Sequence, residues 1–506
     1  MRIKKSLTNI MTGLAGQLFL TITGFVTRTV FISQLGSTYL GVSGLFSNVL
    51  TILSFAELGI GQAIVFSLYK PIAENDQEKI CTLMDLYAKV YRALFFIVLI
   101  LGFAILPFLP YIIADIDAVP HIRIIYSMYV ANSAFSYLFS YRSTFITATQ
   151  NNHIINIFNI LSSLFLSVSQ IATLYLFKNY FVYLSLQIGF GVLTNFVIYI
   201  YSNKKFPFLK NKNAKPLPKE EFNSIKKNVG ALVIYKIGTI ALNSTDNIII
   251  SAFIGIKTVG YYSNYHLLEI SVRGVLSTIF GNLTASIGNL NASDDDDQKY
   301  FMFNVINLAT FWFYGVCSIC LLICMTPFVK VWIGEEYLLS FPVVAIMCAN
   351  FYVAGMLFSS FNYRQTMGLF TKGKLRPIIS AIINLVVSIV LAQVWGLTGV
   401  FVGTIIARLT TNAWYDPYLV FKYGLKKSPA KYFIDYIMKA LILIATAILC
   451  LFVTSYIPDI NIFTVLLKAI VTFIISNGVI LVVNFRTKEF KYLLGVVKNF
   501  KSIIKH

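Results

Sequence analysis

Apolar runs of about 20 residues follow one another along almost the whole chain, and this succession constrains the fold more than any other feature. A helix needs about 20 apolar residues to cross the hydrocarbon core of a bilayer. The chain of 506 residues holds fourteen such runs, near 10–32, 40–69, 90–113, 121–146, 154–177, 180–202, 228–254, 260–288, 301–326, 340–367, 375–395, 397–421, 432–457 and 460–484. The predicted fold is an all-α integral membrane protein with about fourteen transmembrane helices.

Composition supports this prediction. The chain is 57% apolar and 12% charged, whereas a soluble domain has roughly 45–50% apolar and about 25% charged residues. This excludes an ordinary soluble enzyme. The segments between the apolar runs are also short, and the outer ones would span only about 5–15 residues by the span length above. We therefore do not expect an enzyme with an ordered catalytic domain outside the membrane.

The positive charge lies mostly between the apolar runs, and its distribution predicts the orientation of the chain. Alternate segments hold 29 Lys and Arg residues, whereas the other set holds 4, namely Arg123, Lys178, Lys257 and Lys330. Cytoplasmic loops carry such an excess of basic residues. We therefore predict a multi-pass protein of the cytoplasmic membrane with both termini in the cytoplasm. The net charge of +20 then reflects loops and lipid headgroups, and no nucleic-acid partner is expected.

The chain contains an internal duplication. Gly36 and Gly41 of FISQLGSTYLG recur at Gly255 and Gly260 of ISAFIGIKTVG, and the decapeptide YRSTFITATQ resembles YRQTMGLFTK further along the chain. DQEKI at 76–80 likewise resembles DDQKY at 296–300. Near-constant offsets between these three pairs of segments indicate two parallel six-helix repeats. Membrane transporters of this type bind substrate between their repeats.

The duplication predicts the domain organisation. We expect an N-lobe of six spans at 1–203, a basic cytoplasmic linker at 204–227, a C-lobe of six spans at 228–424, and two extra spans with a basic tail at 425–506. The linker carries the sequence KKFPFLKNKNAKPLPKEE, whose Lys and Pro content is typical of an exposed connection.

Charged residues at membrane depth are the candidate functional residues, because each costs at least about 2.5–3.5 kcal/mol at mid-membrane unless it faces a cavity or a partner. The basic ones are Arg28, Arg142, Lys236, Arg273, Arg364, Arg408, Lys439 and Lys468, and the acidic ones are Glu57, Asp246, Glu269 and Asp416. This surplus of arginine suits an anionic headgroup, since guanidinium binds phosphate through two hydrogen bonds.

Some of these charges have structural explanations that the sequence leaves open. Arg142 and Arg364 occupy equivalent repeat positions near cytoplasmic span ends, where they could reach the interface with their long side chains or share a structural role. Glu269 and Arg273 lie four residues apart on one helix face and could simply pair with each other.

Two stretches of the sequence carry a family resemblance. LSFAELGIGQAIVFSLYKPIAENDQEKI at 53–80 and STDNIIISAFIGIKTVGYYSNYHLL at 244–268 resemble the Wzx-type polysaccharide flippases. These belong to the multidrug/oligosaccharidyl-lipid/polysaccharide exporter (MOP) superfamily. The resemblance implies alternating access of two lobes. It also implies a substrate, an oligosaccharide on undecaprenyl diphosphate that is flipped for capsule, exopolysaccharide or O-antigen export. Polysaccharide polymerase and export machinery are candidate partners.

The resemblance also implies roles for particular residues. Arg28 and Arg273, followed by Arg408 and Arg142, are candidate headgroup ligands in a cationic cavity. Glu57 and Glu269 are candidate charge partners or coupling groups, and Glu57 could carry a proton or pair with an arginine.

Coupling to an ion is a further implication of the resemblance. No cofactor is implied, and the options are Na⁺ or H⁺. The related lipid II flippases hold sodium with residues that Asp246, Asn384 and Thr404 match here. Ser388 stands where those proteins have a second Asp, which weakens the match.

Two other functions within the same superfamily remain open from sequence. A lipid II flippase would share the fold. A multidrug exporter takes mainly organic cations and would need an acidic cavity, which eight basic against four acidic residues at membrane depth do not favour.

Overall fold

The computed structural model describes most of the chain and is all-helical there. The described residues are 2–54, 61, 67–149, 151–210, 217–218, 223, 238, 240, 244–281, 283–291, 295–369, 373 and 375–504. No strand occurs among them. Glu57 and Lys236 lie outside the described residues, as does most of the predicted linker.

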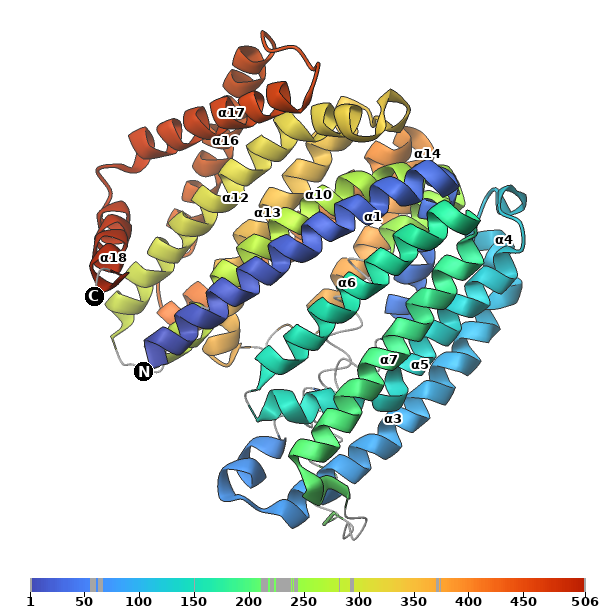
Figure 1. The fold of residues 1–506 in the computed structure, drawn as a ribbon. Helices are drawn as coiled ribbons and strands as arrows, with labels where there is room; N and C mark the ends of the chain where they lie inside the picture. The colour runs from blue at the N-terminus through green and yellow to red at the C-terminus, as the bar shows by residue number, and fades with distance from the viewer. Residues whose placement is uncertain are drawn as a thin grey trace. The chain divides into compact units, whose positions relative to one another are not determined.

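The chain divides into two compact units, Met1–Gly260 and Tyr261–His506, which are described separately. The main helices of the first unit are α1 (Arg2–Leu53), α3 (Gln77–Ile105), α4 (Leu109–Ile112), α5 (Ile122–Ala148), α6 (Asn152–Phe177), α7 (Tyr180–Lys205) and α9 (Asp246–Phe253). Within this unit α5 packs between α3 and α7 (Figure 1).

The second unit continues α10 (Ile256–Gly281), which begins in the first. Its further helices are α11 (Leu283–Asn291), α12 (Asp296–Ile333), α13 (Phe341–Thr366), α14 (Arg376–Ala407), α15 (Ala413–Leu419), α16 (Ala430–Thr454), α17 (Ile462–Asn484) and α18 (Lys488–Ile504). Two π-helical turns, Arg408–Asn412 and Val420–Leu425, flank α15. Helices α16 and α17 pack on α12 and on each other.

Nine helical stretches of the described chain are long and apolar enough to cross a membrane. Two of them, Leu18–Leu53 and Arg376–Leu425, each overlap two predicted spans. Helix α5 coincides with the predicted span at 121–146 but is not one of the nine, since Ser, Asn, Tyr and Thr residues interrupt its apolar sequence. The prediction of an all-α membrane protein is confirmed.

Glycines separate the paired spans at the positions that the sequence predicted. Gly36 breaks α1 with φ of 81°, and Gly396 breaks α14 with φ of 56°. Gly255, the repeat equivalent of Gly36, separates α9 from α10 with φ of 128°. Positive φ strains residues that carry a Cβ atom, so glycine is the residue that ends one helix here and allows the next to start.

The second pair of repeated glycines lies at a close helix crossing within the first unit. A Cβ atom on Gly41 would lie 2.0 Å from the Ile256 carbonyl oxygen, and one on Gly260 would lie 2.1 Å from the Ser37 carbonyl oxygen. Each glycine thus packs against the backbone that precedes the other one. This reciprocal contact is the tertiary counterpart of the sequence duplication, and only small residues allow helix backbones to approach so closely.

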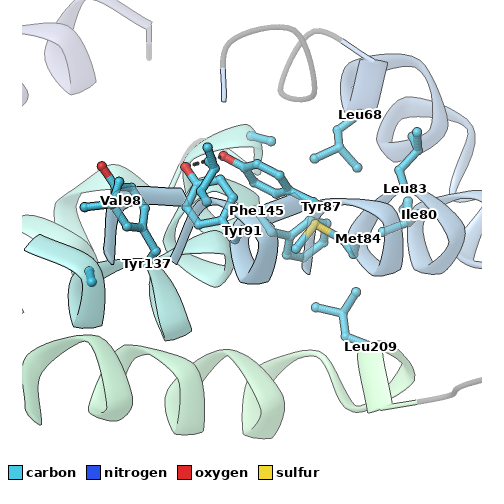
Figure 2. Packing of buried hydrophobic residues seen from close by; sticks show 13 residues of the cluster. Leu68, Ile80, Leu83, Met84, Tyr87, Tyr91, Val98, Tyr137, Phe145 and Leu209 are labelled. Carbon is cyan, nitrogen blue, oxygen red and sulfur yellow. Dashed lines mark hydrogen bonds between the residues drawn. The ribbon is translucent and has the colours of Figure 1, made fainter. Parts of the chain in front are cut away.

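Aromatic packing fills the interior of the first unit. Figure 2 shows Tyr87 and Tyr91 of α3 beside Tyr137 and Phe145 of α5, with Leu209 below them. The Tyr87 hydroxyl donates to the Tyr91 hydroxyl at 2.9 Å. The buried hydroxyls therefore have partners inside the apolar cluster, which removes the cost of burying them unpaired.

Candidate functional site

The two predicted headgroup ligands of the first unit lie far apart. Arg28 of α1 interacts electrostatically with Tyr183 near the start of α7, whereas the guanidinium of Arg142 lies 5.6 Å from the ring centre of Tyr199 near its end. At 1.5 Å per residue these two tyrosines are separated by about 24 Å along the helix. The structure does not bring Arg28 and Arg142 into one site.

Arg142 is buried, with 6% of its surface exposed, so other protein groups surround its side chain. Its Nη2 atom donates to the carbonyl oxygen of Leu209 at 3.0 Å, and the guanidinium lies over the rings of Tyr141 and Tyr199. Its Nε and Nη1 atoms have no hydrogen-bond partner within the described parts of the chain.

The equivalent residue of the second repeat, Arg364, is also buried but is neutralised. Its Nη1 donates to Oδ1 of Asp416 at 2.7 Å, and Arg376 binds the other carboxylate oxygen. Arg364 and Asp416 are each 2% exposed. Arg376 is one of the 29 basic residues that the charge distribution assigns to cytoplasmic segments, but the structure places it at the buried start of α14. The apolar surroundings of Asp416 were the signal that it needed a basic partner.

Two predicted headgroup ligands of the second unit converge on helix α13. Arg273 of α10 forms an ion pair with Glu269, as their four-residue spacing suggested, and its guanidinium lies 5.5 Å from the ring centre of Phe351. Arg408 donates to the carbonyl oxygen of Asn350 at 2.9 Å. Because Asn350 and Phe351 are consecutive, the structure brings both arginines to one level of α13.

Asn350 was missed by the sequence analysis, although an amide in an apolar run is a signal for buried hydrogen bonding. Its side chain donates to the carbonyl oxygen of Phe401 at 2.9 Å and accepts from Arg408 at 3.3 Å. Arg408 opens a π-helical turn, a feature that is frequent at functional sites. We define the α13 cluster as Glu269, Arg273, Asn350, Phe351 and Arg408.

His266 adds a titratable group to one side of the α13 cluster. Its Nδ1 atom lies 3.7 Å from Glu269, and its ring stacks on Tyr262 at 5.4 Å between centres. Glu269 therefore lies between the guanidinium of Arg273 and the ring of His266.

Two of the three predicted sodium ligands lie together. The Asn384 amide donates to the Thr404 hydroxyl at 2.9 Å and to Ser388 at 3.4 Å. Ser388 donates to the Val400 carbonyl oxygen at 2.9 Å. Oxygen ligands suit hard cations, but here the two hydroxyl oxygens already accept from the amide. Asp246, the third residue, begins α9 in the first unit.

No cluster of three or more His, Cys, Asp or Glu residues that could hold a metal ion occurs in the described ranges. Outside the membrane-spanning stretches, Lys427 donates to Asp297 at 2.6 Å, and this hydrogen bond raises the pKa of Lys427. The acidic first turn of α12 therefore binds the basic segment that follows the π-helical turn Val420–Leu425.

The helical arrangement is similar to that of several solved membrane transporters. The structure of the lipid II flippase MurJ in an inward closed conformation matches with a TM-score of 0.64 at 15% identity, covering 94% of this chain and 100% of that one. An inward-facing multidrug resistance MATE family transporter of the MOP superfamily matches with a TM-score of 0.60 at 12% identity, covering 82% and 99%. The Vibrio cholerae MATE transporter VcmN in its bent form matches with a TM-score of 0.55 at 12% identity, covering 83% and 97%.

The sequence itself defines the family. The family model described as polysaccharide biosynthesis protein matches residues 6–283, and the chain therefore belongs to this family. No curated protein sequence matches significantly. A sequence match thus confirms the predicted family. Solved structures that share only about an eighth of their residues with this chain confirm the predicted fold.

Proposed function

We propose that the protein flips oligosaccharide repeat units, carried on undecaprenyl diphosphate, from the cytoplasmic to the outer leaflet of the bacterial cell membrane. Transport proceeds by alternating access and supplies capsule, exopolysaccharide or O-antigen export. Family membership and the MOP fold support a flippase. The convergence of Arg273 and Arg408 on α13 carries the proposal of a diphosphate-bearing substrate.

In this proposal the α13 cluster binds the diphosphate. Glu269 keeps Arg273 neutralised while the site is empty, which limits the cost of a buried charge. The incoming diphosphate then competes with Glu269 for the guanidinium, and the second arginine adds bidentate hydrogen bonds. Arg28 and Arg142, about one helix length apart in the first unit, contact the headgroup at different stages of transport.

Coupling to an ion is part of the same proposal. Asp246, Asn384 and Thr404 are the candidate sodium ligands, and Glu57 and Glu269 are the candidate proton carriers. Uptake of lipid-linked glycan into the outer leaflet of proteoliposomes should then depend on a sodium or a proton gradient. Thr404→Val should abolish a sodium dependence and leave a proton dependence intact, because valine keeps the shape but removes the hydroxyl oxygen.

The test of the function is the leaflet position of lipid-linked glycans in a strain that lacks the gene. Complete repeat units trapped on the cytoplasmic side, and released by the intact gene, are expected. Normal outward delivery together with a changed sensitivity to cationic drugs would favour a multidrug exporter. Accumulation of lipid II instead would favour the cell-wall flippase.

The test of the arginine assignment uses substitutions in the same strain. Arg28→Ala and Arg273→Ala should abolish complementation while the protein remains folded and inserted. Arg123→Ala is the matched control, because Arg123 is exposed in a predicted outer loop. Full complementation by both cavity variants would overturn the cationic-headgroup assignment.

A further inference from the structure

A cavity of about 600 Å³ lies entirely within the first unit. Such a volume falls in the range of roughly 300–1,000 Å³ that small-ligand pockets span. Four helical segments line it, namely the second half of α1 together with α5, α6 and α7. The lining residues that can both donate and accept hydrogen bonds include Ser47, Thr51, Asn132, Ser133, Asn159 and Gln187.

The lining of this cavity is polar but uncharged. Fourteen of its 18 described lining residues carry a hydroxyl or amide group, and none of these 18 is Lys, Arg, Asp, Glu or His. This described lining offers hydrogen bonds rather than a counter-charge for phosphate or an organic cation. A neutral ligand with many hydroxyl groups matches the lining, because hydroxyls and amides both donate and accept hydrogen bonds.

Three of the lining amides are unused by the protein. Asn132 of α5, Asn159 of α6 and Gln187 of α7 form no hydrogen bond within the described part of the chain. Other lining groups pair internally: Ser162 with Thr194, and the Asn195 amide with the Ser136 carbonyl oxygen at 3.4 Å. Each of these three helices thus presents to the same cavity one amide that has no hydrogen-bond partner among the described residues.

We propose that this cavity binds sugar residues of the transported glycan, separately from the arginines that hold its diphosphate. The inference rests on the proposed function. Helix α5 supplies Tyr129, Asn132, Ser133, Ser136 and Tyr137 to the lining. Binding of sugar residues there explains why this helix is too polar to count as an ordinary apolar span. The amides and hydroxyls replace the water that surrounds the sugar hydroxyls in solution.

The experiment measures binding of two lipids to the purified full-length protein in detergent micelles by native mass spectrometry. One probe is undecaprenyl diphosphate, and the other is the lipid-linked repeat unit extracted from the deletion strain. The wild-type protein should bind the glycan-bearing lipid more tightly. Asn132→Leu, Asn159→Leu and Gln187→Leu should each reduce that affinity about tenfold, the expected effect of leaving buried sugar hydroxyls unpaired. Their affinity for undecaprenyl diphosphate should not change.

Controls separate this inference from folding defects and from the proposed function. Asn156→Leu makes the same change on α6 at an exposed position that does not line the cavity, and it should bind both lipids as the wild type does. Unchanged glycan affinity in all three cavity variants would overturn the cavity assignment and leave the flippase proposal standing. A wild-type protein that binds neither lipid would overturn the flippase proposal itself. Asn159 is exposed, so Asn159→Leu remains informative even if the variants at less accessible positions do not fold.

Discussion

The two copies of the repeated YR motif differ in how they accommodate a buried arginine. In the second unit Arg364 shares Asp416 with Arg376. In the first unit Arg142 has a carbonyl oxygen and two tyrosine rings. The two copies thus share the position and burial of the guanidinium, but among the described residues only the second copy places a carboxylate beside it. A buried charge is costly without an ion-pair partner, and two arginines share the single carboxylate of Asp416, so the second cluster still carries a net positive charge.

The repeated glycines show the opposite behaviour. Gly41 and Gly260 make reciprocal contacts, each against the backbone that precedes the other. Here the two copies have kept equivalent roles, because the close approach of two backbones tolerates no side chain on either. Close backbone packing has thus kept the two copies alike at the glycines. The electrostatic surroundings of the buried arginine have diverged between the copies.

Removal of the carboxylate that the two buried arginines share should lower the free energy of unfolding most. Asp416→Asn leaves two buried guanidiniums without an anion, and breaking a buried ion pair in this way costs about 3–5 kcal/mol. Chemical unfolding of the purified protein in detergent measures the loss. Asp117→Asn, at an exposed position, is the control. An unfolding free energy equal to the wild-type value would show that the ion cluster does not stabilise the second unit.

Substitution of the repeated glycines should lower the stability less, and by similar amounts at the two positions. Gly41→Ala and Gly260→Ala each place a Cβ atom against a backbone carbonyl, and such overpacking costs about 1–3 kcal/mol. Thermal unfolding should show similar losses for the two variants. Gly24→Ala is the matched control, since nothing lies within 4 Å of a Cβ atom at that position. Clearly unequal losses would argue against equivalent roles.

Substitution of Arg142 should affect stability least. Arg142→Met loses the hydrogen bond to Leu209 but also removes a buried charge that forms no ion pair among the described residues, so the net change should stay within about 1 kcal/mol. Complementation of the deletion strain should fall more than stability does, if Arg142 contacts the anionic headgroup. A loss of stability as large as that of Asp416→Asn would instead make Arg142 a structural residue.

The sequence by itself determined the span positions and the breaks between them. Apolar runs of 20 residues and the glycines at 36 and 396 are local signals, because hydrophobicity and φ preference act within one helix. The Glu269–Arg273 pair likewise lies within one helix. The duplication is found by comparing segments of the sequence and requires no knowledge of how they pack. The prediction of the membrane fold therefore needed no knowledge of how helices pack.

Only the tertiary structure decided which polar groups meet. Asp416 pairs with arginines on two other helices, Arg408 finds Asn350, and three amides from α5, α6 and α7 face one cavity. The same structure separated Arg28 from Arg142, which the sequence had grouped. These outcomes depend on how far each helix is rotated about its axis and at what depth it crosses its neighbours. That rotation and depth are set by packing over whole helix faces, and no single stretch of sequence specifies them.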